Sequence, residues 1–464
     1  MTGKSNPSLH RDGGKRSVSD VIVIGAGISG LHAAMLLAEQ GAKVLVLEGQ
    51  NRVGGRLRSL RELEGAPEAG GDSILGGYGR VRDVCTTLGL KLIDHESRRG
   101  LSRPEIALDG EIIPFARWPS HPRNQLPADA RNMFPGRRAF EQAVDKHNPL
   151  KSADDWIDPA SARFDEPVYV FLRRIGWSDA AIAQNYEINI GRGTSAHDSS
   201  ILTWYFRRAW DKVQTDIESV ALKVVGGNQS LPEAMARKLG DAVRLSSPVI
   251  GIRQYDRAIE VHTEGGASYA ARYAICATPV PPLRYVKFDP LLPAVLSEAI
   301  ATLPSMQITK IFLTATKPFW EVDGLSPAMW TDTAAGEVAA LRQGAEENRV
   351  TGLMARARGF VAQRLDSLGV EAASAMVVSA IENLRPAAKG KLRVAGYKSW
   401  ARDRFAGGTW SEWEPDQIHR FLPHLVKPVG RLHFAGEHAS LANRGMEAAM
   451  ESGERAAVEV IGLL

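Results

Sequence analysis

An unbroken run of apolar residues at 21–24 follows a polar stretch at the start of the chain. Such a run is typical of a strand that is buried on both faces of a parallel sheet. Residues 28–40 then have the apolar content of a buried helix, Gly41 ends that helix, and 43–47 repeat the apolar run. The pattern predicts a strand–helix–strand unit with parallel strands.

Similar patterns return in the second half of the chain. We expect helices at 81–88, at 231–239 and from about 446, and strands at 243–245, 249–254, 258–263, 273–277, 307–315 and 431–435. Residues from about 97 to 216 are predicted to be mostly helical. Because buried strands stand near both ends of the sequence, we predict one domain assembled from separated segments, with a second domain inserted in pieces.

Three glycines directly after the first strand have the spacing of a dinucleotide-binding turn. Gly25 permits the tight turn, Gly27 lets the backbone approach a pyrophosphate, and Gly30 lets the helix pack on the strand. The helix offers its N-terminal amides to the phosphates. Glu48 follows the second strand, where a carboxylate accepts hydrogen bonds from ribose hydroxyls and repels the 2′-phosphate of NADP. Together these features predict an adenine-dinucleotide site.

A second glycine signal narrows the choice of dinucleotide. Residues 52–56 read Arg-Val-Gly-Gly-Arg, shortly after Glu48. Gly54 and Gly55 allow a close approach of the backbone, and Arg56 supplies a charge-assisted donor. FAD must thread its ribityl chain and second phosphate further into the protein, whereas a simple NAD dehydrogenase does not need this second signal. We therefore predict FAD as the cofactor.

With these motifs the chain resembles the flavin-containing amine oxidase family, which includes monoamine and polyamine oxidases, L-amino-acid oxidases and bacterial relatives. The resemblance extends from about residue 20 to 464 through separated motifs, among them 70–73, 433–438 and 445–453. It implies an α/β fold with a Rossmann-type (glutathione-reductase-like) FAD-binding domain and an α+β substrate-binding domain with a mixed sheet. We assign 18–95, 222–285 and 420–464 to the first domain and 96–221 and 286–419 to the second.

The resemblance also implies which residues bind the cofactor. The backbone of Val249 meets the adenine, Glu437 contacts the ribityl–phosphate region, and Met446 begins a helix that points at the flavin pyrimidine. The full set of implied cofactor-binding residues is Gly25, Gly27, Ser29, Gly30, Glu48, Gly49, Gly54, Gly55, Arg56, Gly70, Gly71, Asp72, Ser73, Val249, Trp400, Gly436, Glu437 and Met446.

Lys310, in the strand predicted at 307–315, matches the lysine that holds a water against flavin N5 in the family. A strand lysine is usually a solvent-facing edge charge. Here it stands between apolar residues, shortly before Lys317-Pro318-Phe319-Trp320, which favours the functional interpretation. The resemblance implies that Lys310 orders a water, assists imine hydrolysis or assists O2 reduction electrostatically.

Trp410 matches one wall of the family's aromatic cage in front of the flavin, and Trp400 is expected to pack beside the ring. An aromatic wall steers the amine nitrogen toward the flavin, although core packing is the usual role of a tryptophan. We predict Lys310 and Trp410 as catalytic residues and Trp410, Arg444 and Gly445 as lining the substrate pocket.

Three departures from the family pattern matter. Thr409 stands where covalently flavinylated relatives have cysteine, which predicts non-covalent FAD. Gly445 stands where the second aromatic wall is expected, so the cage is half open unless Arg444 or Asn443 fills the space. Ser73 stands near the position of the arginine that binds the substrate carboxylate in L-amino-acid oxidases, which favours an amine without an α-carboxylate.

We therefore predict an FAD-dependent amine oxidase. A primary or secondary amine gives hydride to flavin N5, and the imine hydrolyses to an aldehyde or ketone. O2, reduced to H2O2, or a protein electron acceptor then reoxidises the flavin. Three alternatives stay open: an L-amino-acid oxidase or monooxygenase, a flavin desaturase of the carotenoid or porphyrinogen type, and a non-catalytic flavin-fold binding protein. Lys310 and Trp410 disfavour the desaturase, and the intact glycine set disfavours the binding protein.

Composition adds limits to this prediction. With 464 residues, 44% hydrophobic and 24% charged, the chain is typical of soluble globular proteins. The net charge of +4 comes without a basic stripe, so we expect no nucleic-acid partner. Residues 1–17 are predicted to be a disordered tail without a secretory signal, and no apolar run predicts a membrane span. Cys85 and Cys276 imply neither a disulfide framework nor a metal site. We expect a cytoplasmic protein, and a homodimer is compatible with the sequence.

Overall fold

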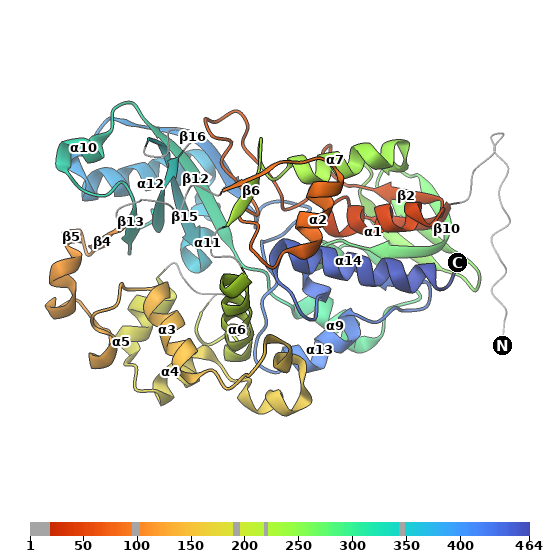
Figure 1. Cartoon of the computed structure of the whole chain (residues 1–464), viewed down its shortest axis with the longest axis horizontal. Helices are drawn as coiled ribbons and strands as arrows, with labels where there is room; N and C mark the ends of the chain where they lie inside the picture. Colours follow the sequence, from red (N-terminus) through yellow and green to blue (C-terminus); the bar gives the residue numbers. More distant parts are fainter. Residues whose placement is uncertain (1–18, 95–102, 189–194, 218–220, 343–348) are drawn as a thin grey trace.

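The structure, a computed structural model, describes residues 19–94, 103–188, 195–217, 221–342 and 349–464. Two large sheets lie apart in the molecule, and helices pack against both of them (Figure 1). The tail predicted at 1–17 lies outside the described residues.

The first sheet is built around β1, whose residues Val21, Ile22 and Val23 are fully buried, as their unbroken apolar run predicts. The strand order is β11-β8-β9-β10-β1-β2-β7, and β17 pairs with β10. β1 is parallel to both β2 and β10, and β10 is parallel to β17. The strands are β1 (Ser19–Ile24), β2 (Val44–Leu47), β7 (Val243–Arg244), β8 (Val249–Gln254), β9 (Ile259–Thr263), β10 (Ser268–Cys276), β11 (Lys287–Asp289) and β17 (Leu432–Phe434).

Two helices from opposite ends of the chain lie side by side on this sheet (Figure 1). They are α1 (Ile28–Glu39) and α14 (Gly445–Ile461), and α7 (Ser230–Leu239) also packs on α1. Gly453 permits the close approach of α14, because a Cβ there would overlap the carbonyl oxygen of Ser29. The last helix therefore completes the layer that begins at α1.

The second sheet has the order β16-β12-β15-β14-β13-β4-β5. Its strands are β4 (Glu105–Leu108), β5 (Glu111–Ile113), β12 (Ile308–Ala315), β13 (Met329–Thr331), β14 (Glu337–Arg342), β15 (Val350–Arg358) and β16 (Leu392–Ser399). One face, with Ile311 and Leu313 of β12, packs on α11 (Gly359–Leu368) and α12 (Val370–Leu384). The opposite face carries Phe312, which packs against Leu60 and Ala69. This second face is therefore turned toward the segment that follows the first glycine motifs.

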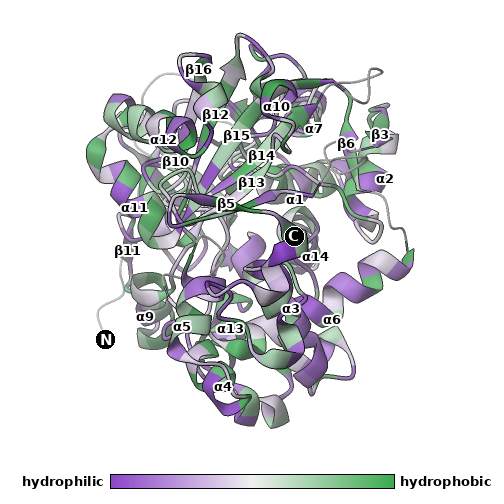
Figure 2. Ribbon diagram, turned by 90° about the vertical axis from the view of Figure 1, so that its left-hand side faces the viewer, coloured by the Kyte–Doolittle hydropathy of each residue, from purple (hydrophilic) through white to green (hydrophobic). Residues whose placement is uncertain are grey.

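A helical layer lies below the second sheet. Figures 1 and 2 both place α3, α4, α5 and α6 on one side of the molecule, away from α10 and α12, and Figure 2 shows mixed hydrophilic and hydrophobic residues along them. The remaining helices are α2 (Gly79–Thr87), α3 (Arg137–His147), α4 (Val168–Arg174), α5 (Asp179–Ile182), α6 (Ile201–Ile217), α8 (Val280–Leu283), α9 (Ala294–Thr302), α10 (Phe319–Asp323) and α13 (Gln417–Leu425). Short helical turns occupy Phe115–Ser120, Ala128–Ala130, Ala153–Ile157, Pro159–Phe164, Ala183–Glu187, Gly240–Ala242, Pro386–Ala388 and Glu437–Ala439. A separate pair of antiparallel strands consists of β3 (Leu92–Asp94) and β6 (Leu222–Val224).

The prediction of a mostly helical segment at 97–216 is wrong where β4 and β5 form a hairpin. The hairpin extends the second sheet, because β4 pairs with β13. Its turn is Asp109-Gly110, with φ of 52° and 77°, which is the backbone conformation of a tight two-residue hairpin loop. Strands of three and four residues are too short to display a clear alternation in the sequence.

One strand falls outside the segment expected for its sheet. β11 lies just beyond the boundary predicted at residue 285, yet it pairs with β8 of the first sheet. The first sheet therefore extends into the segment assigned to the substrate domain, and the other predicted boundaries stay predictions. Within the described ranges, the structure has no helix of sufficient length and apolarity to cross a membrane.

Candidate functional site

The glycine turn between β1 and α1 leaves space at one position and none at another. A Cβ at Gly30 would overlap the carbonyl oxygen of Gly25, so the helix packs directly on the turn. Apart from its chain neighbours, no described atom lies within 4 Å of the place where a Cβ at Gly27 would stand, and no described side chain caps α1 there. The N-terminal amides of α1 therefore border an open cradle of the kind that binds phosphate groups.

Glu48 lies beside this cradle. Its carboxylate accepts the backbone N–H groups of Ala26 at 2.7 Å and Gln50 at 2.8 Å. Burial raises the pKa of Glu48, while these two hydrogen bonds act against the rise. Ser247, two residues before Val249, donates its N–H to the carbonyl oxygen of Glu48 at 2.8 Å. The structure thus brings together the two positions where the sequence predicts ribose and adenine.

The second glycine signal folds back onto the first. Gly54, with a φ of 104°, donates its N–H to the carbonyl oxygen of Ala26 at 2.8 Å. Gly55 has a φ of 53°, and a Cβ there would stand 3.5 Å from the Cα of Gly27. Gly49 is covered by Phe405, whose ring a Cβ would overlap. Both glycine turns therefore border one continuous backbone surface.

Arg56 joins this surface to the C-terminal part of the chain. Its guanidinium donates to the carboxylate of Glu437 at 2.8 Å and to the carbonyl oxygen of Thr409. Glu437 also accepts the N–H of Ser411 at 2.7 Å. The residues predicted for the second phosphate and the ribityl chain are thus in contact with the segment that carries Trp410.

Ser29 and Gly436 meet at the interface of α1 and α14. The hydroxyl of Ser29 lies 3.3 Å from that of Ser452, which accepts the N–H of Gly436 at 2.9 Å. His438 is buried against Gly436, and neither of its ring nitrogens has a hydrogen-bond partner among the described residues. Burial lowers the pKa of His438 to about 4, so the ring is neutral at pH 7. A buried imidazole in this state suits a polar ligand, and no sequence pattern singles it out.

The loop at 68–71 is held from the second sheet. Lys310 Nζ donates to the carbonyl oxygens of Glu68 at 3.0 Å and Gly70 at 3.4 Å. The indole N–H of Trp400 donates to the carbonyl oxygen of Ala69 at 2.8 Å. A Cβ at Gly70 would overlap the carbonyl oxygen of Arg56. Predicted cofactor and catalytic residues therefore meet along one short stretch of backbone.

The neighbours of this loop continue the same surface. A Cβ at Gly71 would stand 3.7 Å from Met446 of α14. Ser73 donates its hydroxyl to Asp72 at 3.2 Å. Glu68 is buried, accepts the N–H of Asn228 at 2.7 Å and has its pKa raised by burial to about 7. Sequence reasoning did not identify Glu68.

Lys310 is a buried residue of a central strand. β12 lies between β15 and β16, which excludes the interpretation as an edge charge. The side chain is 6% exposed. Burial lowers the pKa of Lys310 to about 8 against the attraction of Asp72, and Arg356 lowers it further. Both the charged and the neutral form of Lys310 are therefore accessible near neutral pH.

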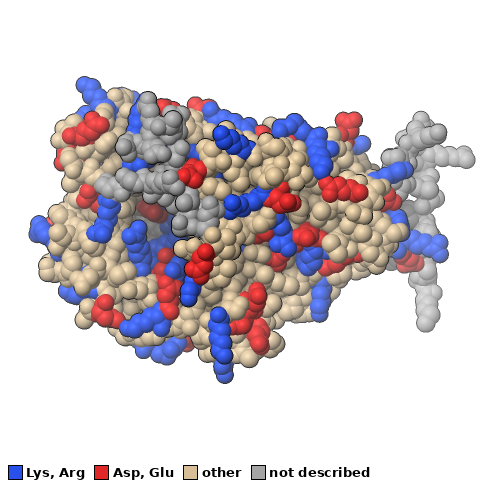
Figure 3. Space-filling model, in the orientation of Figure 1, with Lys and Arg blue, Asp and Glu red and all other residues tan. Residues whose placement is uncertain are grey.

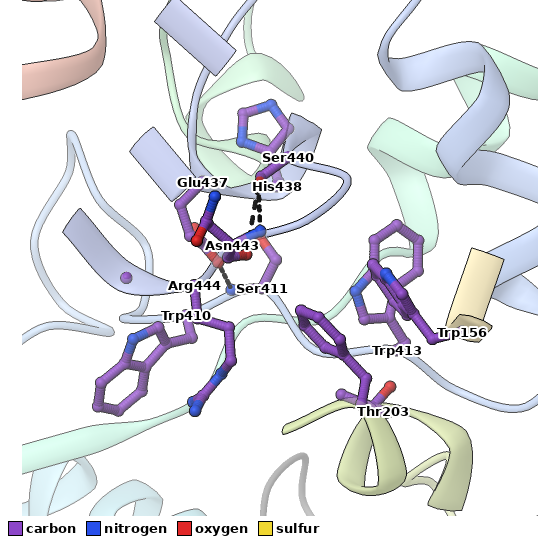
Figure 4. A pocket seen from close by; sticks show the side chains of 12 residues that line it. Trp156, Thr203, Trp410, Ser411, Trp413, Glu437, His438, Ser440, Asn443 and Arg444 are labelled. Atoms are coloured by element: carbon purple, nitrogen blue, oxygen red, sulfur yellow. Dashed lines mark hydrogen bonds between the residues drawn. The ribbon is translucent and has the colours of Figure 1, made fainter. Parts of the chain in front are cut away.

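Trp410 and Gly445 line one pocket, together with Arg444, Glu437 and His438. Figure 4 shows the side chains of Trp410 and Arg444 next to each other, on the side of the pocket away from Trp156 and Trp413. Arg444 pairs with Asp211 of α6 at 3.2 Å. The structure thus gathers the predicted substrate-pocket residues at one place.

Tyr78 occupies the space beside Gly445 where the second aromatic wall is expected. A Cβ at Gly445 would stand 2.7 Å from the hydroxyl of Tyr78, closer than real contacts allow. Arg444 does not fill this place, because its guanidinium is held by Asp211 and lies 5.5 Å from the Trp210 ring centroid. Asn443 accepts the indole N–H of Trp210 at 3.2 Å. Sequence reasoning missed Tyr78, which comes from the turn before α2.

Comparison with known proteins identifies the family of this chain. The model of the family described as flavin containing amine oxidoreductase matches residues 28–461. The chain belongs to this family. The flavin-containing amine oxidase B of Homo sapiens is 28% identical over 466 residues, which cover 95% of this chain and 86% of the relative. The flavin-containing amine oxidase A of Bos taurus is 27% identical over 490 residues, which cover 98% and 88%.

Solved structures of similar fold confirm the predicted fold class. Cyclohexylamine oxidase from Brevibacterium oxydans has a TM-score of 0.75 at 22% identity and covers 96% of this chain and 99% of its own. Wild-type putrescine oxidase bound to putrescine gives the same TM-score, identity and coverage. The fold is thus α/β, with a Rossmann-type FAD domain and a mixed-sheet substrate domain.

The family settles the cofactor and the reaction class. The protein is a flavin-dependent oxidoreductase that acts on CH–NH or CH–NH2 groups, and its cofactor is FAD. The structure fits this group at two independent places: the open cradle at Gly27 and the unpartnered imidazole of His438. The roles of individual site residues stay predictions.

Proposed function

We propose that this protein oxidises a primary or secondary amine to an imine, which hydrolyses to an aldehyde or ketone. Bound FAD supplies the redox chemistry by accepting hydride from the amine α-carbon. The observation that supports this proposal is the direct link from the second sheet to the glycine loop, in which Lys310 and Trp400 hold 68–70 by three hydrogen bonds.

The side chains divide the remaining work. Trp410 forms an aromatic wall of the amine pocket, where a ring face favours a cationic or lone-pair nitrogen. Lys310, held in place by two carbonyl oxygens, positions a water for imine hydrolysis and places an adjustable charge at the site. Thr409 leaves the flavin without a sulfur to bond, so we propose that FAD is bound non-covalently. We propose O2, reduced to H2O2, as the oxidant, with a protein electron acceptor as the alternative.

The substrate class is tested by an anaerobic screen of the yellow holoenzyme against amines and amino acids. We expect amines to bleach the flavin absorbance and α-amino acids to leave it unchanged, since Ser73 offers no guanidinium to an α-carboxylate. Bleaching by α-amino acids alone would overturn the amine assignment. Admission of O2 afterwards should restore the colour with release of H2O2; recovery only with a protein acceptor would overturn the choice of O2.

A further inference from the structure

The face of the second sheet that carries Lys310 holds a row of charged residues. Lys310 is paired in register with Lys398 of β16 and Arg356 of β15, and Arg356 is paired with Glu337 of β14. Residues opposite each other on antiparallel strands project from the same face. Arg358, two residues beyond Arg356, also projects from this face. The opposite face packs apolar side chains against α11 and α12, so the charges are segregated on one side.

Positive charge exceeds negative charge within this row. Arg356 and Arg358 share the carboxylate of Glu337, at 3.4 and 3.2 Å. Although burial opposes it, the two guanidinium groups hold the pKa of Glu337 at about 2. Arg137 of α3 also lies near but is paired with Glu141 at 2.6 Å. Among the contacts described, two guanidinium groups therefore share one carboxylate, and partly buried positive charge of this kind is stabilised by a further anion.

The geometry of Arg356 shows unused hydrogen-bonding capacity. Its Nε–H is buried and has no hydrogen-bond partner among the described residues. Its contact with Glu337, at 3.4 Å, is longer than a strong charge-assisted hydrogen bond. A guanidinium with an unsatisfied N–H is suited to a planar or tetrahedral oxyanion, which can accept two parallel hydrogen bonds.

Strand register places the two arginines beside Lys310 and near the segment that contacts Trp410. Arg358 pairs in register with Ile308, and the N–H of Met306, two residues earlier, donates to the carbonyl oxygen of Trp410 at 2.9 Å. Arg356 stands opposite Lys310 on the neighbouring strand, on the same face of the sheet. Figure 3 shows a hollow in this face of the molecule, between the second sheet and the helical layer of Figure 1, with Lys and Arg as well as Asp and Glu side chains around it.

We propose that the amine substrate carries an anionic group at a distance from its amine carbon, and that Arg356 and Arg358 bind this group. This inference rests on the proposed amine oxidation and narrows its substrate class to acidic amines. A carboxylate and a phosphate share the chemistry that the guanidinium pair recognises. The α-carboxylate of an amino acid is a different case, because it is attached to the reacting carbon itself.

The test compares matched amines on the anaerobic holoenzyme. Hexylamine, 6-aminohexanoate and 6-aminohexyl phosphate share one chain length and differ in the remote group. We expect flavin reduction by an acidic amine to show a Kd roughly ten to a hundred times lower than that of hexylamine, the range of one charge-assisted hydrogen bond. The better acidic amine identifies carboxylate or phosphate. Equal or tighter binding of hexylamine would overturn the inference.

Two variants separate the anion site from general damage. Arg356→Gln should abolish the preference for the acidic amine, so that the Kd values of the acidic amine and of hexylamine become equal. Arg349→Gln is the matched control, because Arg349 precedes the same strand and makes an exposed ion pair with Glu64. It should keep the wild-type preference. An Arg356→Gln enzyme with the wild-type preference would remove Arg356 from substrate binding.

A direct binding measurement does not depend on turnover. Isothermal titration of the holoenzyme with glutarate and with inorganic phosphate should give binding that Arg356→Gln loses and Arg349→Gln keeps. If neither anion binds the wild type, yet amines bleach the flavin, the inference fails and the proposed function stands. If an anion binds through Arg356 but no amine bleaches the flavin, the proposed function fails and the anion site stands.

Discussion

The predicted cofactor side and the predicted amine side of this protein are built by different means. On the cofactor side, backbone atoms form most of the surface: Gly27 leaves a cradle, Gly30 brings α1 onto the turn, and Gly70 lets two loops touch. On the amine side, side chains from distant segments meet, as Trp410 and Arg444 do in one pocket. The first construction depends on where a side chain is absent, whereas the second depends on which functional groups are present.

This difference decides what a substitution does. A Cβ added at Gly30 or Gly70 meets backbone and weakens folding, whereas a Cβ added at Gly27 enters the open cradle and weakens FAD affinity. A change on the amine side removes a charge or a ring from a surface that otherwise stays intact. Substitutions on the two sides test that contrast.

Gly30→Ala and Gly27→Ala should separate folding from cofactor binding. A methyl group at position 30 has no room beside the carbonyl oxygen of Gly25, so we expect a loss of stability on the order of 1–3 kcal/mol or more. A methyl group at position 27 meets nothing in the protein, so the apoprotein should unfold at the wild-type temperature and yet lose yellow FAD on gel filtration. An FAD-loaded Gly27→Ala protein would show that the cradle does not hold the cofactor.

Lys310→Met should slow turnover by about tenfold to a thousandfold, the range of a lost electrostatic or proton-transfer contribution. In the wild type, the lysine loses its charge as the pH rises through about 8, so the rate profile should bend there. The profile of the Met variant should lack that bend, with FAD content unchanged. Stopped-flow absorbance over pH 6–10 measures both effects, and identical profiles would remove Lys310 from the mechanism.

The same substitution should also change how the free energy of unfolding depends on pH. The folded-state pKa of Lys310 lies below its ordinary value of 10.5. Between about pH 8 and 10.5 the unfolded chain therefore binds more protons, and the folded wild type gains stability as the pH rises. Relative to Lys310→Met, the unfolding free energy of the wild type should increase across this window. Urea unfolding at pH 8 and pH 10 measures the difference.

The Tyr78 hydroxyl occupies the place where a side chain at position 445 would begin. Tyr78→Ala should therefore open a space beside Gly445. We expect a several-fold weaker Kd for small amines, because their wall is lost, and a smaller penalty for bulky ones. Tyr78→Phe keeps the ring and serves as the control. Equal amine affinities in all three proteins would show that Tyr78 packs the fold without bordering the amine.

Acid precipitation should produce the smallest change between variants. FAD held without a covalent bond passes into the supernatant, in the wild type and in Thr409→Ala alike. Yellow colour that stays in the wild-type pellet would contradict non-covalent binding. The absorbance of the supernatant gives the released fraction.

Local signals made the cofactor side largely predictable from the sequence. The positions of Gly25, Gly27 and Gly30 encode their roles within one turn, and the structure confirms the turn and its helix. Lys310 was found through its family resemblance, but its partners, the carbonyl groups of Glu68 and Gly70, lie 240 or more residues away. The spacing of apolar residues along the sequence cannot predict such a long-range contact.

Other features were missed for different physical reasons. Tyr78 occupies the place beside Gly445 from a segment far earlier in the chain, which only tertiary packing reveals. The Asp109-Gly110 turn was visible in the sequence, since this dipeptide between apolar residues signals a hairpin. The surplus of arginine on β15 appears in the sequence only as alternate residues of a strand, and its meaning depends on the register with β12 and β14.

The contact of α14 with α1 has a consequence for synthesis on the ribosome. The predicted cofactor site draws on Gly25 near one end of the chain and on the contacts of Met446 and Ser452 near the other. A nascent polypeptide holding only β1, α1 and β2 displays the phosphate turn without the helix that covers it. We therefore expect FAD capture only after that helix has emerged from the exit tunnel.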